Sequence, residues 1–452
     1  MTTTNRIRRI KSAGIHAMIL AGLIGAAGAG AQGLPGWTKQ KKITMNTTAT
    51  GANVAGEVKA YPVAVSLTAA NFDFASAKAD GSDLRFTNAA GAELPFEIES
   101  WDAAGKKAAA WVKTDVKGND KTQFLTIHWG NPAATAAGDG KKVFAKEEGW
   151  SSAWHLAEKG GDAAGYYKDA GENGANGTGV NIKGDATGEG RMGPALNLTR
   201  ASKQYILIDG SAASPLYNPT PSKGTFSIWS NAKSHTGGYV AMFSKGETGF
   251  RIHYFGDGPQ TEPCIDVGSY DWCPLPKGSH TNVDDNKWYH LMYVVDKPSA
   301  WYYINGKLEV TEKDEGAWKT SGNEPVAIGN NATRARSFDG RLDEARIMGV
   351  PKDANWAKLD YESQKEGSTF LTIGTVATGL GESGRTHLAD YARGAAIRRF
   401  DIHGRLVATV RSTGDARADA FELARNAKPG LHFDRLLAAD GSILQTRRVI
   451  LP

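Results

Sequence analysis

Cysteine is scarce in this chain of 452 residues, which has only Cys264 and Cys273. Two thiols are too few for a metal site built from cysteine alone. In an oxidising compartment, two cysteines this close in sequence usually pair. We therefore expect a Cys264–Cys273 disulfide, which would stabilise by restricting the unfolded chain. Two buried free thiols are the alternative.

The common hydrolase motifs are also missing. There is no G-x-S-x-G elbow and no H-E-x-x-H, and the ten histidines are scattered. Retaining glycosidases need two carboxylates on one face. Asp343 and Glu344 are adjacent, so a regular strand would point them to opposite faces. Glu97 and Glu99 share a strand face, which we interpret as the wet side of a half-buried strand. The sequence therefore predicts a protein that is not an enzyme.

The charge is divided unevenly along the chain. The formal net charge is +5, of which four basic residues near the N-terminus supply +4 and the tail from Arg385 onward supplies another +5. The body between them is therefore mildly acidic. Because phosphate binding needs a concentrated basic face, nucleic acid is excluded as an expected partner.

Long apolar runs are absent beyond the N-terminus. There, basic residues precede an apolar run from Ala13 to Ala27, and Ala29-Gly30-Ala31 resembles a cleavage site. We interpret residues 1–31 as a signal peptide, and Gln32 in place of cysteine disfavours a lipoprotein anchor. The mature chain is predicted to have no transmembrane span. It should be exported, either to the cell surface or outer membrane or to the extracellular space.

The stretch from Trp288 to Ile347 gives the strongest fold signal. Its first strand, WYHLMYVV, is apolar on both faces, which is typical of a strand inside a layered structure. Asn305-Gly306 ends the next apolar run and predicts a type I′ turn, because both central residues of that turn need positive φ.

Four landmarks in this stretch resemble the laminin-G-like, concanavalin-A-like family. They are W-x-H at Trp288 and His290, Y-I-N-G-K from Tyr303, A-I-G from Ala327 and F-D-G-R-L-D-E-A-R-I from Phe338. The resemblance covers residues 150–373. It implies a jelly-roll sandwich of two antiparallel sheets that binds glycans, often beside a calcium ion.

An N-terminal domain over residues 32–140 has strand-like alternation between turn signals. It resembles the domain-of-unknown-function family 2341 in D-G-x-D-x-R-F-T from Asp80, L-P-F-E-I-E from Leu94, A-W-V-K from Ala110 and the closing W-G-N-P. Asp80, Asp83 and Asp102 could suit calcium. We favour the alternative that they cap turns by accepting backbone N–H groups.

A flexible linker, residues 374–384, precedes a small C-terminal β domain at 385–452. D-I-H-G-R-L-V, P-G-L-H-F and a closing R-R-V-I-L resemble the C-terminal sorting domain of the type IX secretion system, with an ordinary accessory β-sandwich as the alternative. The resemblance implies the export machinery as a partner. The fold class we predict is thus all-β and multi-domain, with an N-terminal β-sandwich, a central concanavalin-A-like jelly roll and this small domain.

Two candidate sites lie in the central domain. Tyr270, Asp271 and Trp272 fall in the loop between the cysteines, where an aromatic ring could stack on a sugar. Trp272 could instead pack down over the sheet edge. Asp339 and Asp343 lie in the family's F-D-G-x-x-D segment and could hold calcium, the one cofactor expected, or Asp343 could hold a buried backbone or arginine contact.

These observations favour an exported, non-catalytic surface protein that binds carbohydrate or another surface ligand. A divergent glycoside hydrolase acting on plant polysaccharide is one alternative. A structural or adhesion protein of the envelope is the other.

Overall fold

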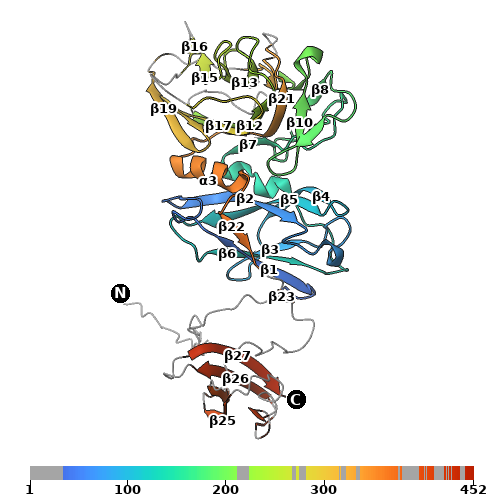
Figure 1. The fold of residues 1–452 in the computed structure, drawn as a ribbon, viewed down its shortest axis with the longest axis vertical. Coiled ribbons are helices and arrows are strands. Elements are labelled where there is room, and N and C mark those ends of the chain that lie inside the picture. Colours follow the sequence, from blue (N-terminus) through green and yellow to red (C-terminus); the bar gives the residue numbers. More distant parts are fainter. Residues whose placement is uncertain are drawn as a thin grey trace, which may run out of the picture.

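The computed structural model describes residues 34–374, apart from 211–222, 267–270, 274–280, 315, 317–321 and 332–335, and parts of the segment 377–451. Two β-sandwiches pack against each other with a helix between them (Figure 1). The predicted all-β class is confirmed. No described helix is long and apolar enough to cross a bilayer. The predicted signal peptide lies outside the described residues.

The first sandwich packs a five-stranded sheet on a three-stranded one. The five-stranded sheet has the order β22-β1-β6-β3, and β23 also pairs with β1; the other has the order β2-β5-β4. The first six strands of this sandwich along the chain are β1 (Lys39–Met45), β2 (Val58–Thr68), β3 (Arg85–Asn88), β4 (Phe96–Asp102), β5 (Lys107–Val116) and β6 (Phe124–Trp129). Short helical turns lie at η1 (Phe74–Ser76), α1 (Gly140–Val143) and η2 (Lys146–Glu148).

The first sheet is completed by chain from beyond the second sandwich. β22 (Leu371–Ile373) and β23 (Ala377–Thr378) both pair antiparallel with β1. Phe370, just before β22, is fully buried. Our sequence boundaries placed β22 at the end of the second domain and β23 in a linker. Strands this short leave little periodic signal, so pairing rather than pattern reveals them.

The second sandwich has an eight-stranded and a seven-stranded sheet. The eight-stranded sheet has the order β19-β18-β17-β12-β21-β10-β9, and β7 also pairs with β21. Its strands are β7 (Trp150–Trp154), β9 (Thr187–Glu189), β10 (Pro194–Leu198), β12 (Lys223–Ala232), β17 (Tyr289–Asp296), β18 (Ser299–Ile304), β19 (Lys307–Lys313) and β21 (Gly340–Met348). The second has the order β16-β15-β14-β13-β20-β11-β8: β8 (Thr178–Val180), β11 (Tyr205–Ile208), β13 (Ala241–Lys245), β14 (Phe250–Tyr254), β15 (Thr261–Asp266), β16 (Asp271–Trp272) and β20 (Val326–Ile328). The turn η3 (Arg200–Ser202) precedes β11.

Strand β17 is buried on both faces, as the sequence predicts. Leu291 and Tyr293 belong to the core of the second sandwich. Met292 and Val294 belong to a second core, which they share with the first sandwich. The eight-stranded sheet therefore has apolar packing on each side, and the two sandwiches form a continuous layered body.

Helix α3 (Ala354–Gln364) fills the junction between the sandwiches (Figure 1). Asp353 caps it by accepting the N–H of Trp356. Trp356 is buried in the core shared with the first sandwich and meets Tyr61 edge to face. The predicted turn at Asn305-Gly306 has positive φ at both residues, 52° and 69°. A Cβ on Gly306 would lie 3.1 Å from the backbone of α3, so the helix packs closely on this hairpin.

A separate four-stranded sheet follows, with the order β25-β24-β26-β27. Its strands are β24 (Ala396–Asp401), β25 (Leu406–Arg411), β26 (Gly430–Leu437) and β27 (Ile443–Leu451). Arg399 on β24 forms a buried ion pair with Asp434 on β26, with Nε 2.6 Å from Oδ1. A small β domain is present as expected, and its sorting role stays a prediction.

The three predicted turn-capping aspartates accept backbone N–H groups. Asp83 is fully buried, and its Oδ2 accepts from Gly130 at 2.7 Å. Asp80 accepts from Ser82, and Asp102 accepts from Gly105. These contacts match the capping alternative.

His128 on β6 should make the first sandwich sensitive to acid. It is fully buried beside Thr87, and burial lowers its pKa from 6.5 to about 4. Between those values the unfolded chain takes up a proton that the folded chain does not, so stability is lost as the pH falls from about 6.5. The slope contributed by this group is at most about 1.4 kcal/mol per pH unit.

Urea unfolding of the wild type and of His128→Gln between pH 7.5 and 4.5 measures this contribution. The glutamine variant, which has no titrating ring, should lose less stability than the wild type over this range. Parallel pH profiles for the two proteins would contradict the prediction.

Candidate functional site

A β-bulge on β4 turns a glutamate toward the domain junction. The register between β4 and β5 shifts between Ile98 and Ser100, which leaves Glu99 as the extra residue. The Glu99 side chain is fully buried and that of Glu97 is 19% exposed. Our interpretation of this face as the wet side of the strand is therefore wrong, because the second sandwich covers it.

A second bulge lies on β21. Its register with β12 shifts beside Glu344, which has a φ of 50°. Leu342 and Ala345 on either side of the bulge both face the sandwich core. The extra residue breaks the alternation, so Asp343 and Glu344 lie together on the opposite face, toward the first sandwich. The expectation that these two carboxylates point to opposite faces is thus wrong.

His155, which follows β7, lies between the two bulges and is close to a glutamate of each. Its Nδ1 lies 2.8 Å from Glu344 Oε1 and 3.9 Å from Glu99 Oε2. Its Nε2 lies 3.2 Å from Glu97 Oε2. The imidazole is stacked on Trp111, with the ring planes 14° apart. Glu99 accepts the indole N–H of Trp111 at 2.8 Å.

Arg346 extends this cluster toward α3. Its guanidinium donates to Glu344 Oε2 from Nη2 at 2.7 Å and to Asp360 Oδ1 from Nη1 at 2.9 Å. It lies 4.5 Å from the centroid of the Trp111 ring, a cation–π distance. His290, on β17, contacts Asp360 Oδ2 at 3.1 Å. His290 is thus a packed structural residue.

We call Glu99, His155, Asp343, Glu344 and Arg346 the junction cluster. Burial and neighbouring charge raise the pKa of two of its carboxyls and lower the pKa of the third. Burial, with the repulsion of Glu344, raises the pKa of Asp343 to about 8 and the pKa of Glu99 well above its usual range. Burial opposes ionisation of Glu344 too, but the His155 and Arg346 cations lower its pKa. At neutral pH we therefore expect Glu344 to be ionised while Glu99 and Asp343 hold protons.

The turn between β9 and β10 covers this cluster. The N–H of Arg191 donates to Asp343 Oδ2 at 2.6 Å. A Cβ on Gly190 would lie 2.5 Å from that oxygen, and a Cβ on Gly193 would lie 2.2 Å from Glu99 Oε1. Glycine at both positions lets the backbone approach the carboxyls closely.

A groove of about 1140 Å³ opens at this junction. Both sandwiches contribute to it: β2, β4 and β5 from the first, and the β9–β10 turn from the second, with the end of α3 and β22 completing the wall. Trp101 lines it together with the charged residues Asp102, Lys107, Glu189, Arg191, Lys365 and Glu366. An aromatic ring beside polar groups is the composition of many ligand sites.

Family comparisons agree with this two-part architecture. The concanavalin A-like lectin/glucanases superfamily matches residues 202–357, and the domain of unknown function DUF2341 matches residues 80–155. The chain carries a DUF2341 domain followed by a laminin-G-like domain. None of the curated proteins matches the chain.

Several solved structures are similar to part of this chain. Domain 4 of AbnA, a GH43 extracellular arabinanase from Geobacillus stearothermophilus, in complex with arabinotriose, is 18% identical, with 48% of this chain and 98% of that chain covered and a TM-score of 0.36. The ligand-binding domain of botulinum neurotoxin serotype D with N-acetylneuraminic acid is 13% identical, with 65% and 71% covered and a TM-score of 0.34. The Ruminococcus gnavus sialidase CBM40 bound to α2,3-sialyllactose is 13% identical, with 31% and 83% covered and a TM-score of 0.26. At these values the likeness carries no functional argument.

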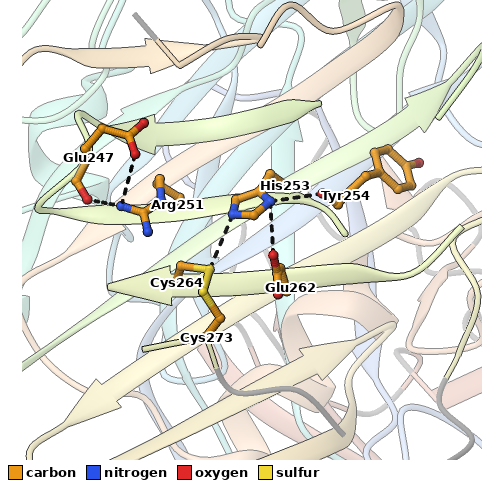
Figure 2. Close-up of a disulfide and its surroundings, with 7 residues drawn as sticks. All are labelled: Glu247, Arg251, His253, Tyr254, Glu262, Cys264 and Cys273. Carbon is orange, nitrogen blue, oxygen red and sulfur yellow. Dashed lines mark hydrogen bonds and ion pairs between the residues drawn. A yellow bond between two sulfur atoms is a disulfide. The ribbon is translucent and has the colours of Figure 1, made fainter. Parts of the chain in front are cut away.

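The predicted disulfide of the laminin-G-like domain is confirmed, since Cys264 and Cys273 are bonded (Figure 2). His253 lies beside it, with Nε2 3.3 Å from Cys264 Sγ and Nδ1 3.6 Å from Glu262 Oε1. Thiolate sulfur is the form that binds metals. While the disulfide holds, this group therefore lacks a thiolate ligand.

The predicted stacking loop is only partly described. Tyr270 and the side chain of Asp271 lie outside the described residues. Trp272 is 8% exposed and belongs to the sandwich core. That position matches the alternative in which its ring packs over the sheet edge, and a binding role for the loop stays a prediction.

The predicted calcium pair is not brought together. Asp343 is fully buried and bonded to the Arg191 N–H, whereas Asp339 is half-buried and its backbone carbonyl accepts from Lys233. Residues four apart on an extended strand are separated by about 13 Å between their Cα atoms. These two residues do not fit one calcium ion in this arrangement, and Asp343 instead makes the buried backbone contact that was its alternative.

Proposed function

We propose that this chain is an exported, non-catalytic binding protein that holds carbohydrate in the groove between its two sandwiches. The observation that carries the proposal is the composition and size of the groove. The match to a superfamily of lectins and glucanases adds support for a sugar ligand. The signal-like N-terminus and the disulfide support export.

Trp101 would provide the stacking surface for a sugar ring. It is half-buried and packed edge to face on Phe72, with ring centroids 5.9 Å apart. Its indole N–H donates to the Ala79 carbonyl at 3.0 Å, and Gly81 lies against the ring. A ring already fixed in place loses little conformational freedom when a ligand binds.

The charged groups of the groove would form hydrogen bonds with the sugar hydroxyls. Carboxylates of Asp102 and Glu189 can accept hydrogen bonds, and Lys107 and Lys365 can donate them. Their mixed signs suit a neutral polyhydroxyl ligand better than a highly charged one. The groove volume of about 1140 Å³ is large enough for several sugar units.

The carboxyls next to this groove favour binding over hydrolysis. Glu99 and Glu344 approach each other, as the two acids of a retaining glycosidase do. However, their side chains are 0% and 1% exposed. A glycosidic bond in the groove cannot reach them in this arrangement, so the hydrolase alternative gains no support from their proximity.

Replacing Trp101 by alanine should weaken binding to a retained polysaccharide about tenfold, because the stacking surface is lost. The measurement is retention of the purified full chain on a panel of soluble and insoluble plant polysaccharides. Phe255→Ala serves as the matched control, since Phe255 is an exposed aromatic residue directly after β14 of the second sandwich, outside the groove.

Three other results would overturn parts of this proposal. Retention that survives Trp101→Ala but is lost in Tyr270→Ala would move the site to the cysteine-bracketed loop. Release of shortened sugars would favour the hydrolase alternative. Absence of retention on every polysaccharide would leave adhesion or envelope assembly as the function to pursue.

A further inference from the structure

We propose that Glu99, His155 and Glu344 form a binding site for one divalent transition-metal ion that joins the two sandwiches. The three residues come from separate parts of the chain: the bulge of β4, the segment after β7 and the bulge of β21. Each offers one ligand atom, and these atoms all lie within 4.8 Å of one another. Its three ligand residues do not include Asp339 or Asp343 and do not line the groove.

The spacing of the ligand atoms fits a small ion. His155 Nδ1 lies 2.8 Å from Glu344 Oε1 and 3.9 Å from Glu99 Oε2. A zinc ion with bonds of about 2.0–2.2 Å places neighbouring ligand atoms roughly 3–3.5 Å apart. The observed separations bracket that range, so small side-chain adjustments would bring all three groups to one ion.

A second layer of contacts already orients each ligand residue. His155 Nε2 lies 3.2 Å from Glu97, Glu344 Oε2 accepts from Arg346, and Glu99 Oε2 accepts from the Trp111 indole. A carboxylate on the far nitrogen of a histidine is the usual outer partner of a metal-bound imidazole, because it fixes the tautomer that leaves the other nitrogen available.

Two buried oxygens of the cluster lack hydrogen-bond donors. Among the residues that the structure describes, Glu99 Oε1 and Asp343 Oδ1 have no partner, although both side chains are fully buried. Buried carboxyl oxygens normally find a donor or a cation. The unpartnered oxygen leaves Glu99 with a buried acceptor that no donor among the described residues occupies.

The ligand set points to zinc or a similar transition metal. One imidazole nitrogen with two carboxylates suits zinc better than calcium, which prefers six or more oxygens. On binding, the ion takes the place of the proton between His155 and Glu344 and of the proton that Glu99 holds, and both protons leave to solvent. The proton on Nε2 stays directed at Glu97.

Titration of the EDTA-treated full chain with ZnCl2, followed by calorimetry and by metal analysis after dialysis, tests the site. We expect one zinc per chain and a rise in melting temperature of several degrees, with calcium unable to compete. Glu99→Gln and His155→Asn should each weaken zinc binding tenfold or more. His253→Asn, in the cluster beside the disulfide, is the matched control and should bind zinc like the wild type.

Circular dichroism of each variant verifies its fold. The wild-type titration does not depend on any variant, and a folded wild-type protein that retains no zinc overturns the proposal. Full zinc binding by folded Glu99→Gln and His155→Asn would overturn the choice of ligands, as would loss of zinc in His253→Asn. Polysaccharide retention is measured separately, so failure of one proposal is distinguishable from failure of the other.

Discussion

Replacing Arg346 by methionine should lower the free energy of unfolding by about 3–5 kcal/mol, because it removes the buried cation that Glu344 and Asp360 share. Arg346 is 1% exposed and donates to both carboxylates. Methionine keeps much of the side-chain volume that packs against Trp111. The decrease in unfolding free energy therefore measures mainly the effect of the missing charge. Urea unfolding at neutral pH, followed by tryptophan fluorescence, measures the change.

Arg341→Met is the control on the same strand. Arg341 is half-buried, donates to the Glu189 carbonyl and packs on Trp288. Losing one such hydrogen bond costs about 1 kcal/mol. Equal losses for the two variants would show that Arg346 does not neutralise the junction cluster.

Ending the chain at residue 367 should unfold the first sandwich. The truncation removes β22 and β23, exposes the edge of β1 and deletes the buried Phe370. Losing a buried phenylalanine alone costs about 3–5 kcal/mol. An exposed strand edge also invites aggregation. Limited proteolysis should then cut within residues 34–140, which we expect to resist cleavage in the full chain.

A chain that ends at residue 384 is the control for this truncation. It retains both short strands and loses only later residues, so its first sandwich should resist the protease like that of the full chain. Equal resistance of the two truncated chains would mean that the first sandwich folds without β22 and β23.

The sequence predicted the parts of the fold that depend on regular patterns. Strand β17 shows its two apolar faces directly in the order of its residues, and each face packs on a different core. Asn305-Gly306 identified its turn because few other residue pairs tolerate two positive φ angles. The short spacing of Cys264 and Cys273, together with the expected export to an oxidising compartment, predicted their bond.

The junction cluster could not be predicted because it depends on two irregularities. A strict alternation places Asp343 and Glu344 on opposite faces, and only the bulge at Glu344 reverses this. Bulges at non-glycine residues leave no reliable signal in a single sequence. The burial of Glu99 depends on the second sandwich, which no local pattern around Glu99 reveals. In the sequence, Gly190 and Gly193 of the β9–β10 turn were the signal that indicated a close approach of the backbone to other groups.

The return of the chain to β1 makes the laminin-G-like domain an insertion within the first sandwich. During synthesis, β6 is complete at Trp129, but β22 begins only at Leu371. At about 5–20 residues per second, the first sandwich would wait roughly 10–50 s for its last strands. For that interval the edge of β1 stays open, and its closure needs a contact that is very distant in sequence. Until β22 arrives, the nascent first sandwich therefore exposes an unpaired strand edge that can aggregate with other chains.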